Sequence, residues 1–172
     1  MICMEVSLIQ QSAIRIKGKN AVLCFDSNDK KESNAIILLN KKSDDIKIAG
    51  EEVIIDGPGE YETGGIKITG IRADQVSAYN VNVDSITISL GNLSTLSKFQ
   101  NKLKEANILI VNCDSDIDSA FLTTLSTNVI ICYGEKASVA GKAVGGENAK
   151  TIPKYASTID KLPAEVETII LG

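Results

Sequence analysis

The chain of 172 residues contains no histidine, and this absence limits the chemistry that its other polar side chains could perform. Histidine is the usual proton shuttle near neutral pH and the commonest metal ligand in proteins. An acid–base or metal-dependent mechanism would therefore have to use carboxylates or thiols. The carboxylates with suggestive spacing are Asp26, the adjacent pair Asp44 and Asp45, and the pair Glu60 and Glu62.

Glu60 and Glu62 lie two residues apart, so a strand would present both on one face. Such a pair could act as general acid and base if it lined a cleft. Tyr61 between them is expected to face the core, which would leave both carboxylates in solvent. We therefore interpret this pair as solvated charges on a strand.

Four cysteines, at positions 3, 24, 113 and 132, are the other candidate reactive groups. None of them forms the Cys-x-x-Cys pair typical of structural zinc sites. Cys113 and Cys132 end strands that we expect to be neighbours, so they could provide a nucleophile or a two-thiol metal site. A nucleophilic cysteine normally needs a nearby base, and no histidine is available. We predict buried, structural thiols.

The run 114–118 has an aspartate at every second position, as calcium-binding loops do. Such a loop also needs glycine at its sixth position and glutamate at its twelfth. Ser119 and Leu125 stand there instead. We expect Asp114 or Ser115 to cap a following helix, because helix N-termini favour acidic and hydroxyl side chains.

The composition is that of a folded globular protein, with 44% hydrophobic and 23% charged residues. A net charge of −4 provides no attraction to nucleic acid or to anionic membranes. Aromatic residues make up only 4%, too few for a base-stacking surface. No apolar run is long enough to span a membrane, and the first nine residues do not resemble a secretory signal. We expect a cytoplasmic protein with free thiols.

Hydrophobic patterning divides the chain into a first half of β-hairpins and a second half that alternates strands and helices. The predicted strands cover residues 7–9, 13–17, 21–25, 35–39, 53–55, 60–63, 66–71, 85–90, 108–111, 129–132, 149–152 and 165–171. The predicted helices cover 94–106, 116–125 and 136–144. This order indicates an α/β (α+β) protein with two sheets and outer helices, which we take as one domain over 1–172.

The segment 53–71, with Asp-Gly-Pro-Gly-Glu-Tyr-Glu at 56–62, resembles a stretch of small bacterial zinc-dependent hydrolases in the metallo-β-lactamase superfamily, in the ascorbate-6-phosphate lactonase-like branch. In that branch a Pro-Gly-Glu-Tyr-Glu turn and strand follows the first metal loop. Residues 12–16, 21–27 and 161–171 resemble further strands of that family in the same order. The resemblance implies a four-layer αββα sandwich of two mixed sheets with outer helices and shortened loops.

In that family the metal is held by a His-x-His-x-Asp-His loop, by further histidines after later strands and by a bridging aspartate. The resemblance places these and the neighbouring site positions at Gln11, Asn40, Lys42, Asp44, Asp45, Ser89, Asn92, and Tyr133 or Gly134, the last preferred. Asparagine is a poor zinc ligand, and a protonated lysine would repel a dication. Without a bound metal, water does not become a hydroxide nucleophile. We therefore predict no catalytic residue, no metal and no cofactor.

These expectations favour a non-catalytic protein that acts as a structural or partner-binding subunit, as a homo-oligomer or with another protein. One alternative is a hydrolase with a rebuilt magnesium or manganese site, using Asp26, Asp44, Asp45 and Lys42. Another is binding of a small molecule in the former active-site pocket, lined by Gln11, Asn40, Ser89 and Asn92.

Overall fold

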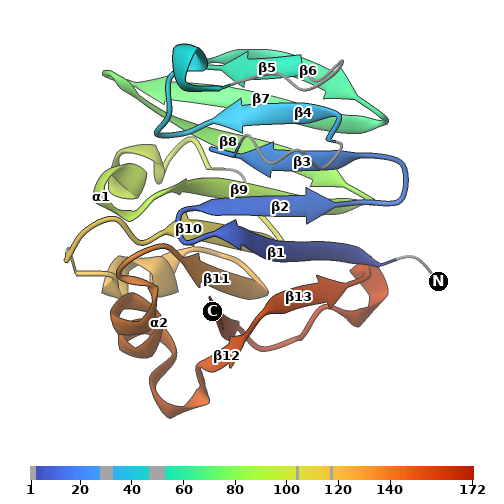
Figure 1. Cartoon of the computed structure of the whole chain (residues 1–172). Coiled ribbons are helices and arrows are strands. Elements are labelled where there is room, and N and C mark those ends of the chain that lie inside the picture. Colours follow the sequence, from blue (N-terminus) through green and yellow to red (C-terminus); the bar gives the residue numbers. More distant parts are fainter. Residues whose placement is uncertain (1–2, 28–32, 47–52, 104, 117) are drawn as a thin grey trace.

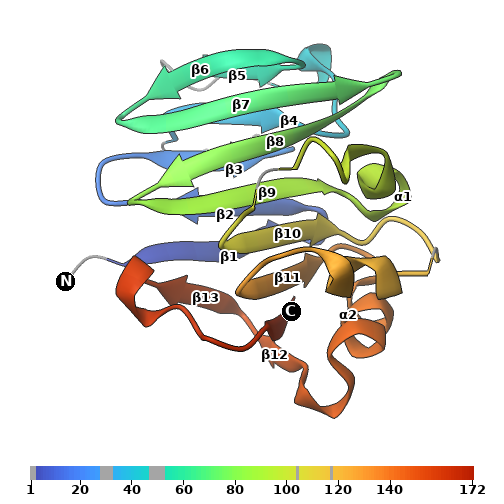
Figure 2. The ribbon, with the colours of Figure 1, turned by 180° about the vertical axis from the view of Figure 1, so that it is seen from behind.

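Two β-sheets packed face to face form the body of the protein (Figures 1 and 2). The computed structural model describes residues 3–27, 33–46, 53–103, 105–116 and 118–172. The first sheet has six strands in the order β13 (Lys154–Ser157), β1 (Met4–Gln10), β2 (Ala13–Lys17), β3 (Val22–Phe25), β4 (Ala35–Leu38) and β5 (Val53–Asp56). Its pairs are antiparallel from β13 to β3 and parallel from β3 to β5.

The second sheet has eight strands, and it is also mixed. Their order is β12 (Lys150–Ile152), β14 (Glu167–Leu171), β11 (Val129–Tyr133), β10 (Ile108–Asn112), β9 (Ile86–Asn92), β8 (Val76–Val83), β7 (Ile66–Ala73) and β6 (Gly59–Thr63). Strands β6 to β9 pair antiparallel, and β9 to β12 pair parallel. The predicted pair of mixed sheets is confirmed.

Alternating side chains of both sheets fill the space between them. In β2, for example, Ile14 and Ile16 are fully buried in this core while Lys17 is exposed. The unbroken run of β4 is buried on both faces, as predicted: Ile37 faces the core, and Ile36 packs with Ile46 on the outer side. Burial of this kind contributes about 25 cal/mol per Å² of apolar surface, so the inter-sheet core is the main source of stability.

Helices lie on the outer face of the eight-stranded sheet over the part formed by β9, β10, β11 and β14, and the described helices leave β6, β7 and β8 uncovered (Figure 2). They are α1 (Leu93–Leu96), α2 (Ala137–Gly145) and the 3₁₀ turns η2 (Ser97–Phe99), η3 (Ala120–Thr124) and η4 (Gly146–Asn148). A second apolar cluster, which includes Leu96, Leu109, Leu122 and Ile130, joins them to the sheet. The remaining described turns are η1 (Ser43–Asp45), after β4, and η5 (Ile159–Lys161), after β13.

Each open end of the sandwich is closed by a segment that crosses from one sheet to the other at a proline. At one end β5 leads through Gly57 and Pro58 to β6, and at the other β12 leads through Pro153 to β13 (Figure 1). Proline has no N–H to donate to a β-ladder, so it ends one strand and allows the chain to change sheets.

The helices are shorter than the sequence predicts. In the described part of 94–106 the expected helix is limited to α1 and η2, since the helical turns end after Phe99, where Gln100, Asn101 and Lys102 are polar. The helix expected over 116–125 is only η3, where the hydroxyls of Thr123 and Thr124 donate to the carbonyls of Ala120 and Phe121. Such local bonds compete with a regular helix. The prediction for 136–144 agrees with α2.

Strands β8 and β13 were not predicted from the sequence. Asn80 and Asn82 interrupt the apolar pattern of β8, although Tyr79, Val81 and Val83 alternate into the core. None of the described helices is long and apolar enough to cross a lipid bilayer.

Gly70 in β7 is required by close backbone packing, and the β-ladders to β6 and β8 run through it without a register shift. A Cβ atom at this position would lie 2.2 Å from the carbonyl oxygen of Gly57. We predict that Gly70→Ala lowers the free energy of unfolding by about 1–3 kcal/mol, measured by chemical denaturation, because the backbone must shift. Gly172→Ala is the control, since its Cβ would meet no atom closer than 3.6 Å. Equal effects of the two substitutions would contradict the prediction.

Candidate functional site

A row of polar side chains lies at the carboxyl ends of three neighbouring parallel strands. Asn92, Asn112 and Tyr133 are the last residues of β9, β10 and β11, and they are direct partners in the parallel register. Two residues earlier in each strand, Leu90, Ile110 and Ile131 face the core between the sheets. Side chains two apart in a strand share a face, so all three polar residues also point to the six-stranded sheet. In open α/β sheets this end of the strands is the usual ligand-binding end.

The six-stranded sheet contributes Asp26 and Asn40, which follow β3 and β4. Asp26 is buried, and its backbone is in the left-handed region at φ 53°. Its carboxylate accepts backbone N–H bonds from Leu39 at 2.8 Å, Asn40 at 2.9 Å and Lys41 at 3.1 Å. These bonds determine the path of the chain after β4 and bring Asn40 over the gap between the sheets.

Three asparagines form one hydrogen-bonded network, the amide cluster, defined as Asn40, Asn92 and Asn112. Asn40 and Asn92 pair reciprocally, with Nδ2 to Oδ1 distances of 3.1 Å and 2.6 Å. Asn112 donates to the same Asn92 Oδ1 at 2.8 Å, and Asn40 Nδ2 also donates to Asp26 Oδ2 at 3.1 Å. The cluster joins one sheet to the other through neutral groups.

Tyr133 completes the row with a fully buried ring whose hydroxyl has no hydrogen-bond partner among the described residues. Burial, and to a smaller extent the negative charges of Asp26, Cys113 and Asp114 when ionised, raise the pKa of this phenol above its ordinary value. Tyr133 is therefore protonated at neutral pH, and it cannot act there as a tyrosinate base.

Tyr79 forms a second polar link between the sheets, close to the first. Its hydroxyl donates to the carbonyl of Leu38 at 2.9 Å and accepts from the N–H of Gly57 at 3.1 Å. Burial raises the pKa of Tyr79 to about 12, although the bond from Gly57 acts in the opposite direction. The neutral hydroxyl thus satisfies two backbone groups next to the ends of β4 and β5.

The structure separates the other predicted site positions from the amide cluster. Lys42, Asp44 and Asp45 lie on or next to η1 and are exposed, and the Asp45 carboxylate accepts the Lys42 N–H at 3.2 Å. Gln11 is exposed in the turn between β1 and β2. Ser89 lies three residues before Asn92, hence on the helical face of β9, where its hydroxyl donates to Asn80 at 2.7 Å.

Asn112 is the member of the site that sequence reasoning did not identify. Gly134 has a positive φ of 95°, and a Cβ atom there would lie 2.4 Å from Asn112 Oδ1. The Asn112 amide therefore occupies the space that a side chain at position 134 would need. The sequence places Asn112 directly after the apolar run 108–111. This position could have indicated it, because that strand is the neighbour of the strand that ends at Asn92.

The remaining candidate groups have structural roles. Cys113 and Cys132 are fully buried, as predicted, and the hydrogen bond between them together with burial raises the pKa of the Cys113 thiol. Asp114 does not cap the helix that follows it. It accepts bonds from the N–H and hydroxyl of Ser94 at α1, whereas Asp118 accepts from the N–H of Ala120 at η3. Glu60 and Glu62 are exposed, and Tyr61 packs on the core, as predicted.

The architecture is shared with hydrolases of the metallo-β-lactamase superfamily. A Thermotoga maritima protein assigned by inference as a zinc-dependent hydrolase of that superfamily superposes with a TM-score of 0.74 at 14% identity, over 98% of each chain. An inferred metal-dependent hydrolase from Parabacteroides distasonis gives 0.60 at 10% identity, over 96% of this chain and 92% of that one. The Igni18 metallo hydrolase of Ignicoccus hospitalis gives 0.53 at 11%, over 76% and 82%. The predicted metallo-β-lactamase-like fold is confirmed.

At the level of sequence no family model and no curated protein matches the chain. The fold implies a metal between the two sheets, but the donor set of this chain does not fit one. In the described ranges no three His, Cys, Asp or Glu side chains converge on a common point. The Asp26 carboxylate is engaged by backbone N–H groups, and the oxygens of Asn40 and Asn92 already accept amide protons. Zinc requires several imidazole, thiolate or carboxylate ligands.

The amide cluster depends on donors that an aspartate would lack. In Asn92→Asp the carboxylate can no longer donate to Asn40 Oδ1, which lies 2.6 Å from Asn92 Nδ2 in the native protein. We predict a loss of about 1–3 kcal/mol of unfolding free energy at neutral pH, by chemical denaturation. The folded state would hold the proton of the introduced carboxyl more tightly than the unfolded state. The variant therefore loses stability as the pH rises from the ordinary aspartate pKa through the higher pKa of the folded state.

Asn82→Asp is the matched control, because Asn82 is exposed on β8 with one long bond of 3.5 Å to Thr87. Asn82→Asp should change the free energy of unfolding little, both at neutral pH and in the acidic range. Asn92→Asp with unchanged stability at neutral pH would show that the fold does not need the network.

Proposed function

We propose that this is a non-catalytic protein with a metallo-β-lactamase fold, acting as a structural or partner-binding subunit that self-associates. The observation that carries the proposal is the amide cluster, in which Asn40, Asn92 and Asn112 bond to one another at the ligand-binding end of the strands. Groups that are satisfied by one another have little capacity left to bind or activate a substrate.

The acid–base properties of the neighbouring groups support a non-catalytic role. The raised pKa values of Tyr133 and Cys113 keep a phenol and a thiol protonated near neutral pH, so neither supplies a nucleophile or a base. Cys132, the hydrogen-bond partner of Cys113, is equally buried.

A hydrolase with a rebuilt carboxylate site finds less support. Asp44 and Asp45 are exposed on η1, whereas Asp26 is buried and accepts three backbone N–H bonds. A magnesium or manganese ion would need these oxygens to be directed at a common centre. A ligand in the former active-site pocket would likewise have to break the amide pairs, and Ser89 lines a different cavity with Gln100 and Leu103.

We predict that protein purified without chelator contains far less than one equivalent of zinc, manganese or magnesium by elemental analysis. It should not hydrolyse ester, lactone or phosphodiester substrates when these metals are added, because the carboxylates do not converge. The contradicting result is stoichiometric metal together with turnover, both lost in Asp44→Ala but kept in Asp160→Ala. Asp160 is the control because it also lies exposed in a short turn, η5.

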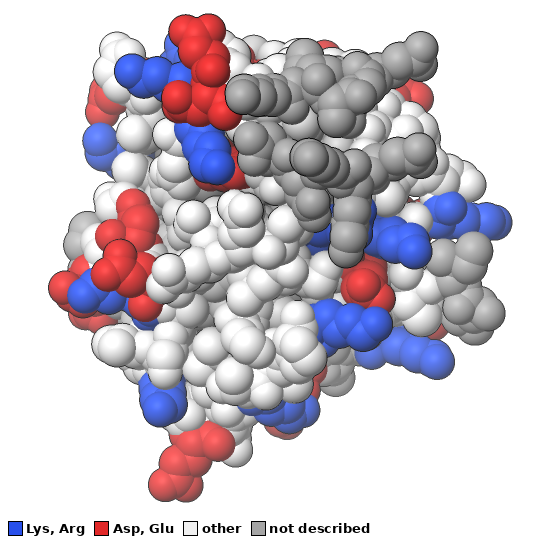
Figure 3. All heavy atoms as spheres, viewed as in Figure 1, with Lys and Arg blue, Asp and Glu red and all other residues white. Residues whose placement is uncertain are grey.

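Self-association is supported by the outer face of the six-stranded sheet. No described helix lies over the β13, β1 and β2 part of this face (Figure 1). Towards β3 and β4 the outward-facing side chains of Cys24, Ile36 and Leu38 are already buried within the chain. Figure 3 shows a broad area without charged side chains in the middle of this view, with charges towards its margins. Arg15 projects from β2 on this face, between Ser7 and Cys24 of the neighbouring strands, and its Nε is buried without a partner. The Arg15 side chain as a whole is half-buried, so its guanidinium group can still donate to an acceptor of a second copy.

We predict a dimer or larger oligomer by light scattering, and a shift towards monomer in Arg15→Glu. The substitution would replace the guanidinium donor with a carboxylate. The contact between two copies would then lose this hydrogen bond, and the carboxylate would repel a carboxylate acceptor of the second copy. Lys67→Glu is the control, because Lys67 is an exposed cation on β7 of the other sheet. A strictly monomeric native protein would refute self-association, and an effect of both substitutions would refute the assigned face.

A further inference from the structure

A cavity of about 540 Å³ opens on the helical side of the eight-stranded sheet. Its volume lies within the range of small-molecule sites, roughly 300–1,000 Å³. It is enclosed by η3, by the end of α2 with η4, by β11, and by the stretch 163–168 that leads into β14. This is the amino-terminal end of the parallel strands, so the cavity is distinct from the amide cluster at their carboxyl ends.

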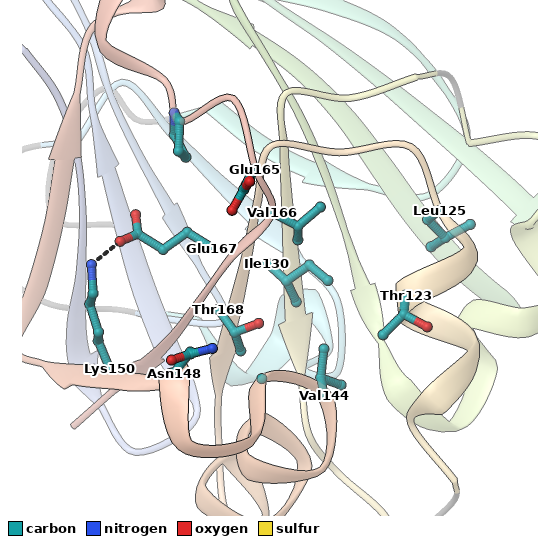
Figure 4. Close-up of a pocket in the computed structure, with 12 residues that line it drawn as sticks. Thr123, Leu125, Ile130, Val144, Asn148, Lys150, Glu165, Val166, Glu167 and Thr168 are labelled. Atoms are coloured by element: carbon teal, nitrogen blue, oxygen red, sulfur yellow. Dashed lines mark hydrogen bonds and ion pairs between the residues drawn. The ribbon is translucent and has the colours of Figure 1, made fainter.

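One wall of the cavity is apolar. Its aliphatic side chains come from two elements and two connecting stretches: Leu125 after η3, Ile130 in β11, Val144 in α2 and Val166 before β14 (Figure 4). Val166 is 55% exposed. A bound alkyl chain would remove this apolar surface from water, which favours binding.

Polar groups line the cavity beside these aliphatic side chains, and two of them have unused hydrogen-bonding capacity. Figure 4 shows Val166 between Glu165 and Thr168, and the Thr168 hydroxyl directed to the side of Ile130 and Val144, above Asn148. Across the part of the chain that the structure describes, Glu165 and Thr168 form no side-chain hydrogen bond or ion pair. Thr168 is largely buried nonetheless, so its hydroxyl is held at a fixed position at the base of the cavity.

The electrostatics of the cavity favour a positive charge. Lys150 is the one cation in its lining, and it is ion-paired with Glu167, which leaves the charge of Glu165 uncompensated. Helix α2 ends at Gly145 in the same lining, and the carboxyl end of a helix carries a partial negative charge. Lys142 in the last turn of α2 is exposed and is not part of the lining. An anionic ligand would therefore find no free cation.

We propose that this cavity binds a small aliphatic amine. The ammonium group lies between the Glu165 carboxylate and the Thr168 hydroxyl, whose oxygens accept hydrogen bonds from its N–H groups. The alkyl chain runs along Val144 and Val166 and extends towards Leu125. The inference does not depend on the non-catalytic role or on self-association, since none of the cavity residues belongs to the amide cluster or to the outer face of the six-stranded sheet.

Methyl NMR of the full chain, labelled at Ile, Leu and Val, tests the proposal with pentylamine, pentan-1-ol and pentanoate as probes. The amine should shift the methyl signals of Leu125, Ile130, Val144 and Val166 in a saturable way, while the methyls of Ile68 in the distant half of the sheet stay unchanged. The alcohol should bind several-fold more weakly, and pentanoate should not bind.

Glu165→Gln should weaken binding of the amine about three- to fivefold, the size expected for a partly exposed charge pair. Thr168→Val, which keeps the shape of the side chain, should also weaken it. Glu62→Gln is the control, because Glu62 is an exposed strand glutamate far from the cavity. The proposal is overturned by the absence of a saturable shift, by equal binding of alcohol and amine, or by full affinity in Glu165→Gln.

Discussion

The carboxylate of Asp26 is the interaction on which the rest of this end of the molecule depends. It accepts three consecutive backbone N–H groups after β4, and its own backbone adopts a left-handed conformation to do so. A buried carboxylate is costly unless its oxygens are satisfied, and bonds to a charged acceptor contribute about 1.5–3 kcal/mol each. Because these bonds hold the chain after β4, Asn40 reaches Asn92 in the opposite sheet.

The amide cluster joins the two sheets without a metal ion, which distinguishes this protein from a metal centre in the same fold. Two sheets with metal ligands at their strand ends are joined by the metal, so their stability depends on its concentration. Here Asn40, Asn92 and Asn112 join the sheets through amide bonds that need no ion, and Tyr79 adds a second link through Leu38 and Gly57. The fold is retained because the inter-sheet core, not the site, supplies most of the stability.

The sequence predicted elements well where burial imposes a simple pattern, as in the apolar runs that became β4, β10 and β11. It predicted helices too long, because hydrophobic spacing does not show that threonine hydroxyls would bond locally in η3. Asn40 and Asn92 were placed by the order of motifs, but Ser89 cannot join them, because three residues along a strand lead to opposite faces. Asn112 required the parallel register, which depends on long-range pairing.

The two ends of the parallel strands differ in whether their polar side chains are free to bind a ligand. At the carboxyl ends of β9 and β10 the side chains bond to one another across the sheets, so binding there would have to break existing bonds. At the amino ends of β11 and β14 the helical layer leaves a cavity, and the groups of Glu165 and Thr168 have no competing partner in the described structure. Because a ligand gains most from groups that are already fixed and unpaired, the ligand binding that we propose for this protein lies at the end of the strands opposite the usual active site.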